Sequence, residues 1–192
     1  MKQIFGYYID KPLTNKQLTL KFSPSSISIK DYWRNNGLSA DFIANYLITF
    51  LSKNSNDVSM IQKQSEIKSA ASYIANELLE NSIKYCNYNV QWPISVQLQF
   101  DAEQVRFFAT NSINKNSIEA FQEFIEKLIV SDPEELYFKQ LEKSAGNSEI
   151  NISGLGLLSI INDYSAMLGW KFDTVKEKPE IITVTTMVQL CL

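Results

Sequence analysis

The stretch Glu77-Leu78-Leu79-Glu80-Asn81-Ser82-Ile83-Lys84-Tyr85 ends the longest amphipathic pattern in the chain, which predicts a helix from about Val58 to about Tyr85. At about 100° per residue, the side chains of Glu77, Asn81 and Lys84 fall on one narrow strip beside the apolar stripe. Such a strip has the groups needed to polarise a nucleophile, to ligate Mg²⁺ and to reach a phosphate. By spacing alone, the strip also fits the solvated edge of a core helix, which is the commoner arrangement.

A second motif, Ser153-Gly154-Leu155-Gly156-Leu157, precedes an apolar helix that we expect to run to about Leu168. Two of the six glycines of the chain lie in this motif. Glycine lets the backbone approach a phosphate closely, and the N–H groups at the start of a helix favour an anion. Taken by itself, the motif also fits a tight turn from a loop into a helix.

The two motifs together resemble the GHKL superfamily of ATPases, which includes gyrase and the histidine kinases. The residues from Glu77 to Tyr85 are similar to its N-box, and those from Gly154 to Leu157 are similar to its second glycine box. The resemblance covers about residues 58–192. The small size and the absence of histidine look most like the anti-sigma-factor serine kinases and the SiaB-like regulators, and residues 22–41 further resemble small cyanobacterial regulators of this group.

This resemblance implies an ATP-binding regulator of bacterial signal transduction that acts on a STAS-like partner as a Mg-ATP-dependent serine/threonine kinase. The implied catalytic base is Glu77, and the implied Mg²⁺ ligand is Asn81. The residues that the resemblance assigns to ATP binding are Asn81, Lys84, Tyr85, Asn111, Gly154, Leu155, Gly156 and Leu157.

One part of the family pattern is missing. The D-x-G-x-G motif that should follow the second hairpin strand is replaced by Asn111-Ser112-Ile113-Asn114, which has neither glycine. The amide oxygen of Asn111 can accept the hydrogen bond from adenine, but it has no charge. The alternative function is therefore a degenerate pseudo-ATPase that controls its partner by binding alone.

The whole pattern predicts a single α+β domain, a two-layer α/β sandwich with a mixed, mostly antiparallel sheet and helices on one face. We expect residues 1–57 to be an N-terminal extension that either forms a layer for homodimerisation or partner docking or extends the sheet. The elements expected along the chain are a strand at residues 18–22, a helix that begins at Ser39, the N-box helix, a hairpin at residues 94–109, helices that begin at Ser117 and Asp132, the glycine box and its helix, and closing strands at residues 170–174 and 181–190.

The composition of the 192 residues excludes several kinds of site. Because histidine is absent, the chain has no Ser-His-Asp triad, no histidine base and no phosphoacceptor histidine. Its two cysteines, Cys86 and Cys191, are too few for a disulfide scaffold or a cysteine zinc site. The formal charge of −3 argues against a nucleic-acid partner. No apolar run is long enough for a signal peptide or a membrane span, so we expect a cytoplasmic protein without a membrane partner.

Overall fold

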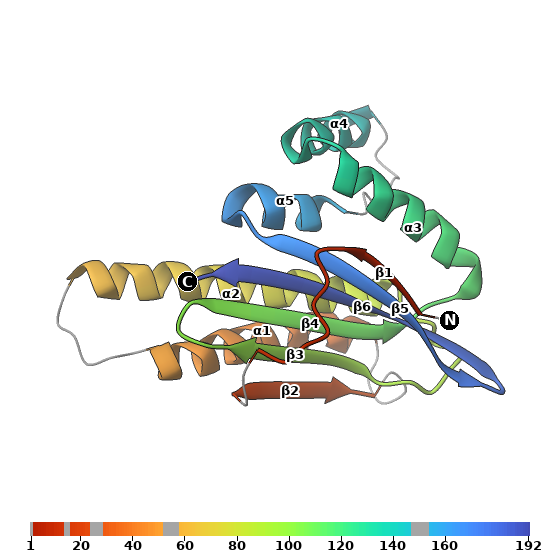
Figure 1. Cartoon of the computed structure of the whole chain (residues 1–192), viewed down its shortest axis with the longest axis horizontal. Helices are drawn as coiled ribbons and strands as arrows, with labels where there is room; N and C mark the ends of the chain where they lie inside the picture. Colours follow the sequence, from red (N-terminus) through yellow and green to blue (C-terminus); the bar gives the residue numbers. More distant parts are fainter. Residues whose placement is uncertain (1, 14–15, 24–28, 52–57, 147–153) are drawn as a thin grey trace.

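The computed structural model describes residues 2–13, 16–23, 29–51, 58–146 and 154–192, which form one sheet with helices on one of its faces (Figure 1). The strands are β1 (Lys2–Gly6), β2 (Gln17–Phe22), β3 (Ile94–Phe100), β4 (Gln104–Ser112), β5 (Met167–Glu177) and β6 (Glu180–Cys191). The helices are α1 (Ile29–Leu51), α2 (Val58–Lys84), α3 (Lys115–Val130), α4 (Pro133–Gly146) and α5 (Leu155–Tyr164).

The strand order across the sheet is β1-β5-β6-β4-β3-β2, and every pair of neighbours is antiparallel. The predicted two-layer α+β class is therefore confirmed. The sheet of the described residues contains no parallel pair, although a mixed sheet was expected. Two of the antiparallel pairs follow from the connections: β3 and β4, and likewise β5 and β6, are joined by short hairpin turns, which can join only antiparallel strands.

The two strands nearest the N-terminus occupy opposite edges of the sheet, so the chain between them crosses the outer face, away from the helices (Figure 1). The Leu13 N–H donates to Oε1 of Gln99 on β3 at 3.1 Å. The guanidinium of Arg106 on β4 donates to the carbonyl oxygen of Lys11 at 3.2 Å. These bonds hold the crossing segment, residues 7–13, against the sheet.

The core lies between the inner face of the sheet and the helices. Alternate residues of β3 and β4, including Val96, Leu98 and Phe107, are almost fully buried against them. The apolar stripe of α2, which includes Ile74 and Leu78, is buried as its spacing predicts. This packing holds the adjacent polar strip of α2, which includes the half-buried Glu77 and Asn81, at the edge of the core.

Several expected boundaries were wrong. Helix α1 begins at Ile29, ten residues before the expected cap at Ser39, because the buried positions of the helix continue back through Asn36. The next helix after the hairpin begins at Lys115 with Asn114 as its N-cap residue, not at Ser117. The expected cap of α4 is confirmed, since the Glu135 N–H donates to Oδ1 of Asp132 at 2.9 Å.

Other boundaries differ at the ends of the later elements. Helix α5 stops at Tyr164 rather than at about Leu168, because Ser165 adopts a left-handed conformation and β5 begins at Met167. Strands β1 and β2 and helix α1 come from residues 1–57, and they share the sheet and the core with the rest of the described chain. No helix in the described ranges combines the length and the apolar character that a membrane crossing requires.

Candidate functional site

The two sequence motifs meet in space at the start of α5. Gly156, the second residue of α5, lies directly against the carboxylate of Glu77 on α2: a Cβ atom added at Gly156 would overlap Oε2 of Glu77. Any other amino acid at position 156 would require the Glu77 carboxylate to move. The second glycine of the motif therefore lets the N-terminus of α5 approach the acidic residue of α2.

The first glycine of the motif has a different role. Gly154 adopts φ +101°, a left-handed conformation that residues with a side chain rarely adopt, and its carbonyl accepts the hydrogen bond from the Leu158 N–H at 3.1 Å. An added Cβ atom would also overlap the ring of Phe124 on α3. Gly154 thus allows both the sharp entry into α5 and the close approach of α3.

The space between the motifs is a cavity of only about 20 Å³. Phe121 and Phe124 of α3 line it, together with Tyr85 of α2. The ring of Tyr85 stacks on that of Phe121 with centroids 6.4 Å apart, and Phe121 stacks on Phe124 at the same distance. A volume of this size holds about one water molecule. Among the described residues, the space between Asn81 and Gly154 is therefore smaller than a nucleotide.

The structure brings some of the assigned residues together and leaves others apart. Asn81, Tyr85, Gly154 and Leu157 line the cavity, along with Thr186 of β6. The remaining assigned residues, Glu77, Lys84, Asn111, Leu155 and Gly156, are not among its lining residues.

The residues outside the cavity have other surroundings. Lys84 is exposed, and its ammonium lies 5.5 Å from the ring centroid of Tyr85. Asn111 is buried within β4, where its Nδ2 donates to the carbonyl oxygen of Ser112 at 2.9 Å. Leu155 is half-buried at the start of α5. Ser153, which opens the glycine motif, is outside the described residues.

Glu77 is the titratable group at the contact between the motifs. Burial raises the pKa of its carboxyl group, and the negative charge of Glu80 raises it further. No ion pair of Glu77 occurs within the described parts of the chain. Because burial disfavours the charged form, a half-buried carboxylate accepts a proton more readily than an exposed one. Nowhere in the described ranges do three or more Cys, Asp or Glu side chains gather in a way that could hold a metal ion.

Phe121, Phe124 and Thr186 are site residues that the motifs do not include. The sequence does place Phe121 and Phe124 on the apolar stripe of an amphipathic helix, together with Ile125. That stripe predicts burial, but it does not say which surface the helix covers. Only the path of the chain from β4 into α3 places the two rings over the glycine turn.

Comparison with known proteins supports the fold and leaves the family open. No protein-family model matches the sequence, and no curated protein matches it. Among solved structures, a chain of the crystal structure of the SiaB–SiaC complex from Pseudomonas aeruginosa is similar, with a TM-score of 0.54 and 18% sequence identity. The similarity covers 90% of this chain and 89% of that chain. The two chains therefore share a fold over most of their length.

Proposed function

We propose that this protein is a regulator of bacterial signal transduction that controls a STAS-like partner protein by binding it. Two observations support the proposal: the fold is similar to that of a chain in the complex of SiaB with SiaC, and the N-box and glycine motifs resemble those of the anti-sigma-factor serine kinases. The same motifs support a place in the GHKL superfamily, near the small cyanobacterial regulators.

The small cavity between the motifs carries the proposal that binding alone is sufficient. A nucleotide site needs space for a base, a ribose and phosphates, and pockets for small molecules typically measure about 300–1,000 Å³. The 20 Å³ between Asn81 and Gly154 is far below that range. The first glycine box is also absent at residues 111–114. Both observations favour the pseudo-ATPase over the kinase.

Partner binding is tested by calorimetric titration of the purified chain with each STAS-domain protein encoded by the source organism. We expect saturable binding to at least one of them without nucleotide, with a Kd that Mg-ATP leaves unchanged. Analytical ultracentrifugation of the free chain in the same preparation tests whether it forms a homodimer. A panel in which no STAS-domain protein binds, with or without nucleotide, would overturn the proposal.

The second candidate is a Mg-ATP-dependent kinase, and the contact between Glu77 and Gly156 favours it. The contact places an acidic residue with a raised pKa beside a glycine turn at the N-terminus of a helix. In this candidate, Asn81 would hold Mg²⁺ and Glu77 would serve as the catalytic base. The arrangement requires the rings of α3 to leave the space between Asn81 and Gly154 first.

Thermal unfolding with and without Mg-ATP separates the two candidates. A ligand at 100 times its Kd stabilises a protein by about 2.7 kcal/mol. For a chain of this length, each kcal/mol raises the Tm by about 2–4 °C. The binding-only regulator predicts no shift for the wild type or for Phe124→Ala, which opens the cavity. The matched control is Phe138→Ala, which removes an exposed ring of α4.

The kinase predicts a shift in the wild type that is larger in Phe124→Ala and unaffected by Phe138→Ala. In that case, Asn81→Ala should remove its dependence on Mg²⁺, and Glu77→Ala should keep the shift but stop phosphorylation of the partner. A nucleotide shift in the wild type together with partner phosphorylation would overturn the binding-only proposal.

A further inference from the structure

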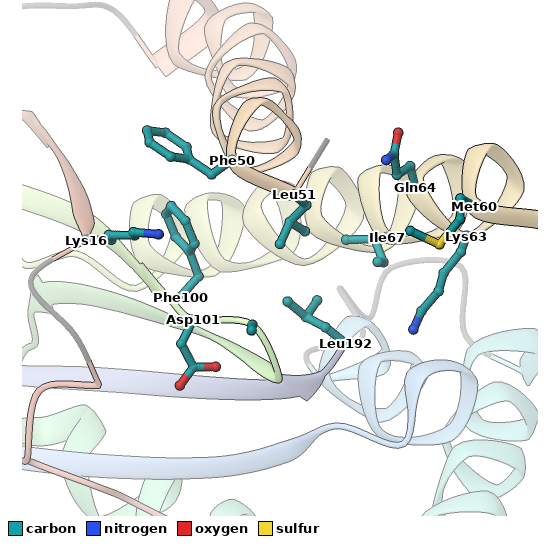
Figure 2. Close-up of a pocket in the computed structure, with 11 residues that line it drawn as sticks. Lys16, Phe50, Leu51, Met60, Lys63, Gln64, Ile67, Phe100, Asp101 and Leu192 are labelled. Carbon is teal, nitrogen blue, oxygen red and sulfur yellow. The ribbon is translucent and has the colours of Figure 1, made fainter. Parts of the chain in front are cut away.

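A second and larger cavity lies at the far end of α2 from the candidate site (Figure 2). It measures about 340 Å³, within the range of small-molecule pockets. Its lining residues on α2 lie between Met60 and Ile67, about 20 Å along the helix axis from Glu77 and Asn81.

The walls of this cavity are mainly apolar and come from segments far apart in the sequence. Its larger apolar side chains are Phe50 and Leu51 of α1, Met60 and Ile67 of α2, Phe100 of β3 and Leu192 (Figure 2). Phe100 is almost fully buried and forms a rigid floor, and its ring centroid lies 5.3 Å from that of Phe50. By contrast, 48% of Phe50 and 37% of Met60 are exposed to solvent. A bound apolar group would cover these two side chains.

The described lining of the cavity has more cationic than acidic side chains. Lys16 and Lys63 both line it, and Lys63 has no ion pair within the described residues. Among the described lining residues, the single acidic side chain belongs to Asp101, whose Oδ1 accepts hydrogen bonds from the N–H groups of Glu103 and Gln104 at 2.8 and 3.0 Å. Asp101 is thus engaged in the β3–β4 turn, and its carboxylate points away from the apolar side chains in Figure 2.

We propose that this cavity binds a small amphiphilic carboxylate, with the apolar chain against Phe50, Met60 and Phe100 and the carboxylate beside Lys63. A lysine on the rim of an apolar cavity can rest its methylene stem on the wall and keep its ammonium in water. There it pairs with the charged end of a ligand whose tail is buried. The site is separate from the glycine turn, so the proposal does not rest on the function proposed above.

The test is calorimetric titration of the full chain with octanoate, octanol and octylammonium. We expect octanoate to bind saturably with one site per chain, and to bind at least tenfold more tightly than either of the other two. Lys63→Glu should weaken octanoate binding about tenfold or more, since a hydrogen bond between charged groups is lost and a like charge is introduced. Lys63→Arg should keep the Kd within about threefold.

Two further variants define the position of the ligand. Lys68→Glu changes an exposed lysine of the same helix that does not line the cavity, and it should leave the Kd within about twofold. Ala102→Trp adds a large side chain at the exposed tip of the β3–β4 turn and should abolish binding by filling the cavity. Far-UV circular dichroism and the Tm of each variant establish that it is folded.

Three results would overturn the proposal. The first is the absence of saturable octanoate binding to the wild type. The second is equal binding of octanoate, octanol and octylammonium, which would show that Lys63 does not select a carboxylate. The third is octanoate binding that both Lys63→Glu and Ala102→Trp leave unchanged, which would place the ligand elsewhere on the protein.

Discussion

The contact between Glu77 and Gly156 predicts a strong coupling between two residues 79 positions apart in the sequence. Gly156→Ala should increase the helix propensity of α5, a gain of up to about 1 kcal/mol. In the wild type, the new methyl group overlaps the Glu77 carboxylate, and overpacking of this kind costs about 1–3 kcal/mol. The single variant should therefore be destabilised by about 0–3 kcal/mol.

In a Glu77→Ala background, the overlap disappears and only the gain in helix propensity remains. Gly156→Ala should then stabilise the protein by up to about 1 kcal/mol, so the coupling energy is about 1–3 kcal/mol. Urea unfolding of the four proteins in the cycle measures this energy. Glu66→Ala is the control partner, because it lies about 16 Å away along α2 and should combine additively with Gly156→Ala. A Glu77–Gly156 coupling below about 0.5 kcal/mol would refute the packing of α5 on α2 described above.

Three other substitutions test separate features of the structure. Burial raises the pKa of Glu77, so the stability of the wild type should fall as pH rises from 4.5 through the raised pKa. Glu77→Gln should therefore have a higher Tm than the wild type at pH 7. This difference in Tm should disappear below pH 4.5. Hydrogen bonds from Lys2 and Lys171 lower the pKa of the Asp10 carboxyl group. Asp10→Asn should therefore lower the free energy of unfolding by less than about 1 kcal/mol at pH 7. This difference from the wild type should vanish as pH falls below 3.8. Gly154→Ala should lose about 1–3 kcal/mol because of its positive φ and the nearby ring of α3, whereas Gly37→Ala, with open space on α1, should gain up to about 1 kcal/mol in the same urea titration.

The regular part of the fold could be predicted from the sequence, because it depends on local periodicity. The stripe through Ile74 and Leu78 and the alternation in the hairpin at residues 94–109 gave the correct elements in the correct layer. The start of α1 was wrong, since Ser39 has the residue type of a cap but lies inside a continuing helix. A capping residue indicates a helix start only where no helix already precedes it.

The candidate site could be predicted only in part, because tertiary packing determines which side chains of α3 lie between the two motifs. The spacing of Glu77 and Asn81 on α2 correctly places them on one side of the helix, and the glycine motif indeed meets them. The sequence could not show that Phe121 and Phe124 would fill the space between the motifs. Nor could it show the cavity beside Lys63, whose walls come from segments as far apart in the sequence as Lys16 and Leu192.

The position of β1 has a consequence for how the protein folds during synthesis. β1 pairs only with β5 in the sheet, and Phe5 lies opposite Trp170. At about 5–20 residues per second, a ribosome needs on the order of ten seconds or more to make the chain between them. Throughout this interval the N-terminal strand has no partner, while the helices and the central hairpin are already available to form. Strand β1 is therefore made well before β5, and it can join the sheet only after β5 has been synthesised.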